Sequence, residues 1–302
     1  MSDLGRLDEL LEQGRFVVTG ELVPPRSPDP EPVRRIARRL RGMVDAVNVT
    51  DNAAARVAMS PLAAAVLASA EGLEPVLQLT CRDRNRLALA ADLLGAHALG
   101  MRTLLCLSGD PMEIGPNTSA KAVFDLDAVG LARMASDLGQ GVGPGGQAVA
   151  PAARFLIGVA EAPGADPSGG ERLAAKVAAG ARFVQTQPIY DVRGFTEWLD
   201  RVGERGLTEK VAILAGVLPP RSVAQLERFA RLPGWAVPED TLRRLRAAPD
   251  VKQAGVDVAV EAIAQVRDLP GVRGVHLMGL GADSGVPEVI EGAGLLPRPR
   301  PR

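Results

Sequence analysis

The sequence contains few of the residues on which metal sites, disulfide scaffolds and nucleophilic catalysis depend. Its 302 residues include two histidines, His97 and His276, and two cysteines, Cys81 and Cys106. The histidines have no cysteine or carboxylate neighbours at metal-ligand spacing, so no metal site is expected. Both cysteines fall in predicted strands, which argues against a disulfide framework and favours a reducing cytoplasm. Neither a G-x-S-x-G nor a G-x-x-x-x-G-K-[ST] motif occurs.

Strong charge and long apolar runs are also missing. The formal net charge is −1, so the chain has no overall positive field that would favour nucleic acid. No apolar run approaches the roughly 18 residues that a membrane helix needs. Residues Met1–Gln13 are charged and resemble a short helix rather than a secretion signal. We therefore expect a cytoplasmic protein whose partner is neither a membrane nor a nucleic acid.

Eight short apolar segments alternate with helical stretches, and 46% of the chain is hydrophobic. The segments are Phe16–Val23, Ala46–Thr50, Pro75–Thr80, Thr103–Leu107, Phe155–Ala160, Phe183–Thr186, Val211–Val217 and Gly274–Met278. Continuous apolar runs of this length are typical of parallel strands buried on both faces. The pattern predicts an α/β protein, a single-domain (β/α)8 TIM barrel over residues 1–302, with an N-terminal helix at Leu4–Gln13.

An open doubly wound sheet is the alternative architecture. It is disfavoured because no G-x-G-x-x-G follows the first predicted strand. The chain ends in Pro-Arg-Pro-Arg-Pro-Arg, which offers no apolar surface to bury. Residues 294–302 are therefore expected to form a disordered tail.

Each predicted strand ends in a polar or glycine-rich segment. These segments hold Glu21, Asn48–Asn52, Gln78–Cys81, Ser108–Pro111, Val159–Glu161, Gln185–Pro188, Gly216–Pro219 and Met278–Gly281. The carboxyl ends of barrel strands meet at one face, where barrel enzymes place their active sites. The residues in these segments are therefore the candidate site.

Two carboxylic acids stand out at this rim. Glu21 precedes two prolines, and a carboxyl group held there and partly desolvated can act as a general acid with a raised pKa. The alternative for Glu21 is an ion pair with Arg26. Asp110 lies between Gly109, which permits a close backbone approach, and a proline. Taken alone it resembles an ordinary turn aspartate, but two acids at strands one and four would face the same cavity.

Neutral amides and hydroxyls supply most of the other rim residues. Gln185 and Gln187 are two residues apart and are expected to point the same way, toward a flat heterocycle. A satisfied polar pair in the barrel wall is the competing interpretation. Asn48, Thr50 and Gln78 are similar hydrogen-bonding groups. Such a rim suits an organic cofactor that carries the difficult chemistry, and the residues alone do not identify that cofactor.

Several motifs, in order, resemble the methylenetetrahydrofolate reductase family in its short bacterial form. The matching segments are TGELVPPR, VNVTDN, LQLTCRDRNR, LLGAHALGMRTLLCLSGDP, AVFDLD, TQPIYD and GVLP. They are most similar to the branch fused to homocysteine methyltransferases. The resemblance implies bound FAD, reduction by NADH or NADPH, and hydride transfer to 5,10-methylenetetrahydrofolate, giving 5-methyltetrahydrofolate.

The resemblance also assigns roles to individual residues. Glu21 matches the acid that protonates N10 of the folate, and Asp110 matches an aspartate near the flavin pyrimidine and the pterin. The expected cofactor-binding residues are Asn48, Thr50, Gln78, Ser108, Gly109, Asp110 and Lys176. The expected substrate-binding residues are Glu21, Asp110, Gln185, Gln187 and Tyr190. Glu21 and Asp110 are the expected catalytic residues.

Three positions depart from the family pattern. Gln78 stands where many members have histidine, Ser108 where some have arginine, and Asn117 where related sequences have tyrosine. These departures keep two alternatives open: a flavin-free reductase that takes hydride directly from NADH, and a non-redox folate-binding or methyl-channelling subunit. A homo-oligomer or a methyltransferase partner is compatible with either. A barrel enzyme of unrelated chemistry would require the ordered motifs to match by accident.

Overall fold

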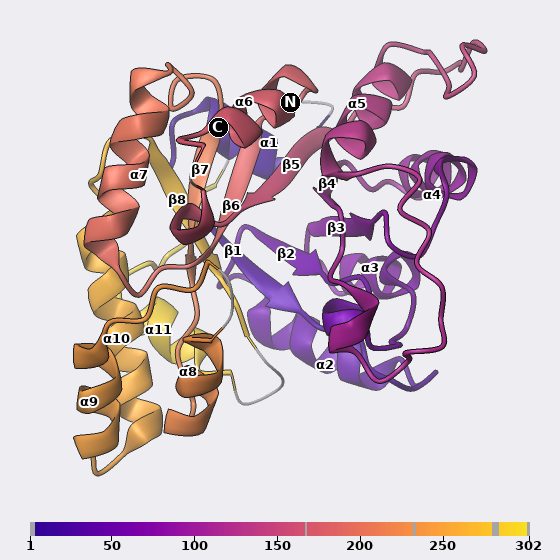
Figure 1. Cartoon of the computed structure of the whole chain (residues 1–302). Helices are drawn as coiled ribbons and strands as arrows, with labels where there is room; N and C mark the ends of the chain where they lie inside the picture. The colour runs from indigo at the N-terminus through magenta and orange to yellow at the C-terminus, as the bar shows by residue number, and fades with distance from the viewer. Residues whose placement is uncertain (1–3, 167, 232–233, 280–283, 301–302) are drawn as a thin grey trace.

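The computed structural model describes residues 4–166, 168–231, 234–279 and 284–300. Within these ranges, eight parallel strands form a closed barrel in sequence order, and β8 pairs with β1 (Figure 1). The strands are β1 (Val17–Leu22), β2 (Ala46–Val49), β3 (Pro75–Thr80), β4 (Thr103–Leu107), β5 (Leu156–Glu161), β6 (Phe183–Pro188), β7 (Ala212–Val217) and β8 (Val272–Leu277). The predicted (β/α)8 barrel is confirmed.

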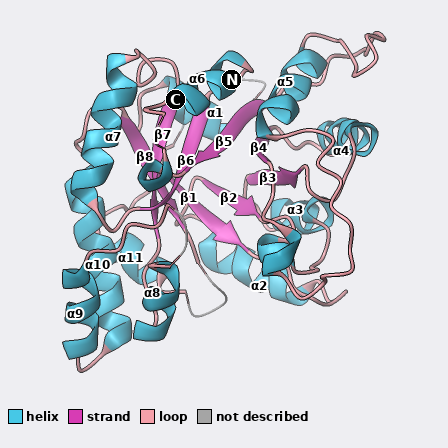
Figure 2. Cartoon of the chain, viewed as in Figure 1, coloured by secondary structure: helices cyan, strands magenta, loops and turns pink. Residues whose placement is uncertain are grey.

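Helices surround the strands (Figure 2). They are α1 (Arg6–Glu12), α2 (Glu31–Leu40), α3 (Pro61–Ala70), α4 (Arg86–Ala98), α5 (Ala128–Gly139), α6 (Glu171–Ala178), α7 (Val192–Glu204), α8 (Val223–Phe229), α9 (Glu239–Ala247), α10 (Val251–Val266) and α11 (Val286–Gly292), with 3-10 turns η1 (Ala53–Ala55), η2 (Met112–Ile114) and η3 (Pro163–Ala165). Three helices, α8 to α10, fill the last crossover. None of the described helices has the length and apolarity to span a bilayer.

At the amino-terminal ends of the strands, the barrel interior is apolar and is closed by the N-terminal helix α1. Leu7 and Leu10 of α1 are fully buried against the inward side chains of Val17 and Phe183. The Phe183 ring lies so close to Gly158 that a Cβ there would sit 2.1 Å from it. Burial of such side chains contributes about 1.5–3 kcal/mol each, so α1 acts as a plug that stabilises the barrel.

The segment that was expected to form a disordered tail is described through residue 300. Residues 294–300 lie against the same end of the barrel, where the Arg298 guanidinium donates to the Asp45 carboxylate at 2.6 Å and to the Phe16 carbonyl at 2.8 Å. The Arg6 guanidinium donates to the Pro299 carbonyl at 2.6 Å. Buried Asp45 supplies the ordering interaction that the composition of the tail did not indicate. Residues 301 and 302 lie outside the described residues.

Candidate active site

Glu21 lies on the inner face of β1 at the carboxyl end of the barrel. Side chains alternate along a strand, so Glu21 shares its face with Thr19, which bonds inside the barrel, and Val17 below it. One carboxylate oxygen accepts a hydrogen bond from the Gly279 amide at 3.2 Å. Burial raises the pKa of Glu21 from 4.5 to about 7, and the Gly279 bond offsets part of that rise.

The alternative role for Glu21, an ion pair with Arg26, is not seen in the described part of the chain. Glu21 instead borders a small cavity of about 30 Å³ with Gly279 and Val286. A carboxyl group with a pKa near 7 is protonated in a substantial fraction of molecules at neutral pH, as a general acid requires. Leu280 and Gly281, the rest of the polar segment after β8, lie outside the described residues.

Asp110 is exposed just beyond β4 and reaches across to the segment after β2. Its carboxylate oxygen Oδ2 accepts a hydrogen bond from the Ala54 amide at 2.8 Å. Gly109 has φ +98°, a conformation that favours glycine, and a Cβ there would lie 2.9 Å from the Cβ of Arg82. Glu21 lies near the carboxyl end of β1 and Asp110 follows the carboxyl end of β4, and because the strands are parallel, both acids lie at the same end of the barrel.

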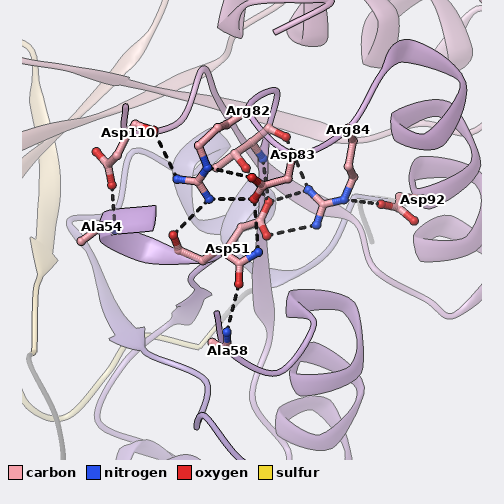
Figure 3. Close-up of polar contacts among 10 residues, drawn as sticks. Asp51, Ala54, Ala58, Arg82, Asp83, Arg84, Asp92 and Asp110 are labelled. Atoms are coloured by element: carbon pink, nitrogen blue, oxygen red, sulfur yellow. Dashed lines mark hydrogen bonds and ion pairs between the residues drawn. The ribbon is translucent and has the colours of Figure 1, made fainter. Parts of the chain in front are cut away.

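A cluster of charged residues supports this part of the rim (Figure 3). The Arg84 guanidinium forms two hydrogen bonds with buried Asp51, at 2.6 and 3.0 Å, and Asp51 also accepts from the Thr80 amide and hydroxyl. Arg82, which is 1% exposed, donates to both carboxylate oxygens of Asp83. The Arg82 bond holds the pKa of Asp83 below its usual range.

The sequence-based assignment of site residues left this cluster out. The feature of the sequence that could have indicated the cluster is the run of charged residues in Cys-Arg-Asp-Arg-Asn, directly after an apolar strand. Alternating signs at adjacent positions resemble an exposed, solvated turn, and nothing in the sequence indicates that Arg82 is buried.

A polar layer crosses the barrel interior beneath the rim. The Asn48 and Gln185 amides exchange hydrogen bonds of 2.6 and 3.1 Å, and the Gln185 amide also donates to the Thr19 hydroxyl at 3.1 Å. The Thr19 hydroxyl contacts Nδ1 of His276 at 2.9 Å. Burial lowers the pKa of His276 to about 3, so this imidazole is neutral. Gln185 is therefore satisfied by Asn48 and Thr19, whereas the alternative considered from the sequence paired it with Gln187.

Gln187 lies in different surroundings from Gln185. The pairing of β6 with β7 shifts register between Gln185 and Pro188, so a spacing of two residues does not give a shared environment. Gln187 borders a cavity of about 380 Å³ with Asp166 and Tyr190. The Tyr190 hydroxyl donates to the Leu218 carbonyl at 2.8 Å, and burial raises its pKa. Of the two glutamines, only Gln187 lines this cavity.

The residues expected to hold a flavin are engaged with the protein itself. The Ser108 hydroxyl accepts from the Ala128 amide at the start of α5, and Lys176 donates to Glu161 and to the Ala160 carbonyl, both at 2.6 Å. Thr50 and Gln78 are buried, and by strand alternation Gln78 shares the inward face of β3 with Val76. A pyrophosphate needs cationic or N–H donors, and Lys176 is already neutralised by buried Glu161. In this arrangement these residues do not form a flavin cradle.

Both cysteine thiols are buried, and burial raises the pKa of each. Burial raises the pKa of Cys81 to about 12, and its Sγ donates to the Asp127 carbonyl at 3.3 Å. Cys106 is buried beside it in the barrel wall, and burial raises its pKa as well. Among the described residues, no group of three or more His, Cys, Asp or Glu side chains could hold a metal ion.

Comparisons with known proteins agree with the family resemblance of the motifs. Methylenetetrahydrofolate reductase 1 of Schizosaccharomyces pombe is 29% identical over 74% of this chain and 36% of its own length. A probable methylenetetrahydrofolate reductase (NADPH) of Caenorhabditis elegans is 25% identical over 96% of this chain and 44% of its own length. This chain thus spans less than half of either protein. The 5,10-methylenetetrahydrofolate reductase of Pectobacterium carotovorum is 26% identical over 87% of this chain and 85% of its own length.

Among solved structures, the fold is similar to that of a Clostridium thermocellum protein described as binding two copies of 5-methyl-5,6,7,8-tetrahydrofolic acid. The TM-score is 0.69 at 13% identity, and the alignment covers 97% of this chain and 99% of that protein. The sequence pattern of the family described as methylenetetrahydrofolate reductase matches residues 6–294. This match covers nearly the whole barrel, and the chain therefore belongs to the methylenetetrahydrofolate reductase family.

Proposed function

We propose that this protein reduces 5,10-methylenetetrahydrofolate to 5-methyltetrahydrofolate with hydride from NADH or NADPH. The observation that carries the proposal is Glu21, an inward-facing carboxyl group with a pKa of about 7 at the carboxyl end of the barrel. Family membership supplies the reaction, and the name of the C. elegans relative includes NADPH. The folate bound by the C. thermocellum protein is the product of the same reaction.

The proposed mechanism uses Glu21 as a general acid. Neutral Glu21 donates its proton to N10 of the folate, which breaks the bond from N10 to the methylene carbon and leaves a cationic iminium at N5. Hydride then adds to that carbon and forms the methyl group. The reaction consumes one NAD(P)H and one proton, and solvent returns the proton to Glu21. Protonation that creates the cation before hydride arrives stabilises the transition state more than the bound substrate.

In this proposal, Asp110 and Gln187 bind the folate. The Asp110 carboxylate is exposed at the rim, where its negative charge would favour the cationic iminium over the neutral methylene form. Gln187 offers an amide with both a donor and an acceptor beside the cavity of about 380 Å³. The polar layer formed by Asn48 and Gln185 lies beneath them and keeps the base of the site rigid.

Bound FAD would change one step of the proposed reaction, the route by which hydride reaches the folate. The family resemblance implies FAD, whereas Lys176 and Ser108 are held by other groups of the protein. The steps above therefore rely on the chain's own residues and on a nicotinamide donor. We expect freshly purified protein to contain well under one flavin per chain. A ratio near one would show that these residues are released on binding and that hydride passes through the flavin.

The decisive experiment measures 5-methyltetrahydrofolate formed from the methylene compound with NADH or NADPH, for wild type and for Glu21→Gln. We expect the variant to lose about 10²–10⁴-fold in turnover, the usual contribution of a general acid. Glu74→Gln is the matched control, because burial also raises the pKa of Glu74 but its carboxylate bonds to the Leu7 amide at the opposite end of the barrel. Turnover by Glu21→Gln near that of the control would refute the acid assignment.

A non-redox folate-binding or methyl-channelling role is the second candidate. It is favoured by the C. thermocellum protein, which is described by its bound methylated folate, and by the absence of a flavin cradle among the described residues. In that case the protein would bind 5-methyltetrahydrofolate but oxidise neither NADH nor NADPH with any folate. The activity would then belong to a complex with a methyltransferase or to a homo-oligomer. Folate-dependent oxidation of either nicotinamide excludes this candidate.

A further inference from the structure

Arg82 is an almost fully buried arginine at the turn that follows β3. Its side chain is 1% exposed, and its donors reach three different segments of the rim. Nε and Nη2 donate to Asp83 at 2.8 and 2.7 Å, Nη2 also donates to the Asn52 carbonyl at 3.1 Å, and Nη1 donates to the Asp110 carbonyl at 3.3 Å. Figure 3 shows the guanidinium between Asp110 and the other acids.

The backbone of the Arg82 turn also holds the segment after Asp110. The Val123 amide donates to the Arg82 carbonyl at 2.7 Å, and the Phe124 amide donates to the Cys81 carbonyl at 3.1 Å. Phe124 and Ala54 have φ values of +43° and +53°, which residues with a Cβ rarely adopt. Such conformations persist only where the surrounding structure enforces them. The Arg82 turn bonds to Phe124 through the Cys81 carbonyl and to the Asn52 carbonyl, two residues before Ala54.

We propose that Arg82 is a positioning residue for Asp110. The buried guanidinium ties the segment after β4, which carries Asp110, to the segment after β2, which carries Ala54 and Asn52. It thereby fixes where the Asp110 carboxylate meets the folate, without itself touching the substrate. This inference rests on the proposed function, because folate binding by Asp110 is part of that proposal. A lysine cannot replace Arg82, since one ammonium group cannot reach Asp83, Asn52 and Asp110 together.

The kinetic test compares Arg82→Lys with Arg86→Lys. Arg86 is the matched control, because its guanidinium also forms two hydrogen bonds with one carboxylate, Asp125, at 2.9 Å each, and is half-exposed. We expect Arg82→Lys to raise KM for methylenetetrahydrofolate by about 10- to 100-fold and to change kcat less, as displaced binding groups do. Arg86→Lys should keep the wild-type KM. Asp83→Asn, which leaves the arginine but removes its charged anchor, should raise KM in the same direction.

An activity-independent readout is amide exchange at Ala54, whose N–H donates to the Asp110 carboxylate. We expect this amide to exchange at least about 10-fold faster in Arg82→Lys and Asp83→Asn than in wild type, and at the wild-type rate in Arg86→Lys. If the wild type does not reduce methylenetetrahydrofolate, the proposed function fails, and the exchange rates still decide whether Arg82 places Asp110. Lower thermal stability with unchanged KM and unchanged Ala54 exchange would show a structural role only and would overturn the proposal.

Discussion

Nη2 of Arg298 lies 2.6 Å from Oδ2 of Asp45, which places the C-terminal segment against the start of β2. The Asp45 side chain is fully buried, and that of Arg298 is 6% exposed. Asp45 also accepts hydrogen bonds from the Val18 amide at 2.8 Å and from Arg6 at 3.1 Å. One buried carboxylate therefore joins the first helix, the first two strands and the end of the chain.

Replacing Arg298 with alanine should destabilise the fold by about 1.5–3 kcal/mol, because buried Asp45 loses one of its two arginine partners and keeps Arg6. Urea denaturation followed by circular dichroism measures this change. Arg243→Ala is the matched control, since the Arg243–Asp240 pair is exposed and should contribute at most about 1 kcal/mol. Equal effects of the two substitutions would contradict the role given to the C-terminal segment.

The pH dependence of kcat/KM should follow the protonation of Glu21. The acid form is the active one, and its pKa is about 7, so kcat/KM should be highest below pH 7 and fall about tenfold per pH unit well above it. Initial rates between pH 5.5 and 9 measure this basic limb, over which kcat/KM should fall by roughly two decades. Glu74→Gln should retain the limb. A flat profile in wild type would count against Glu21 as the proton donor.

Asp110→Asn and Asp110→Ala separate the charge of Asp110 from its position. The asparagine amide oxygen can still accept from the Ala54 amide, so its effect reports the lost negative charge. We expect Asp110→Asn to weaken folate binding by about tenfold, as one charged contact does, and Asp110→Ala to weaken it further because the segment after β2 is released. Titration calorimetry with 5-methyltetrahydrofolate measures both. Equal affinities for wild type and both variants would remove Asp110 from the site.

The two glutamines of β6 should respond in opposite ways to substitution. Gln185→Leu leaves the buried Asn48 amide without its partner and should lower stability by about 1–3 kcal/mol, with little change in KM of the folded fraction. Gln187→Leu should leave stability within about 0.5 kcal/mol of wild type, as peripheral substitutions do, and raise KM. Denaturation curves and kinetics on both variants test this. A raised KM for Gln185→Leu alone would place the substrate deeper in the barrel.

The barrel was predictable because its strands are continuous apolar runs that are buried on both faces. The first predicted strand, Phe16–Val23, differs from the observed Val17–Leu22 by one residue at each end. The helix at Val286–Gly292 was not predicted, although Val289 and Ile290 are fully buried. The contacts of the C-terminal segment could not be predicted, because proline and arginine carry no apolar signal and the partner of Arg298 is Asp45, 253 residues earlier in the sequence.

At the candidate site, the sequence indicated which strand ends carry polar residues but not the partners of those residues. Asn48 and Gln185 are 137 residues apart, and no local pattern reveals that their amides satisfy each other. The register shift after Gln185 separates the surroundings of the two glutamines, and such an irregularity has no fixed sequence pattern. Arg82 is buried only because the segments after β2 and β4 close over it. Long-range pairing of this kind depends on the assembled barrel.

The plug formed by α1 and the segment through Arg298 has a practical consequence for handling the protein. The Arg6 guanidinium donates to the Pro299 carbonyl at 2.6 Å, so both described ends of the chain emerge side by side, at the end of the barrel opposite Glu21 and Asp110. An affinity handle, a fluorescent reporter or a surface tether attached to either end would leave the mouth of the barrel open to small molecules. A short linker between the ends would also permit circularly permuted forms.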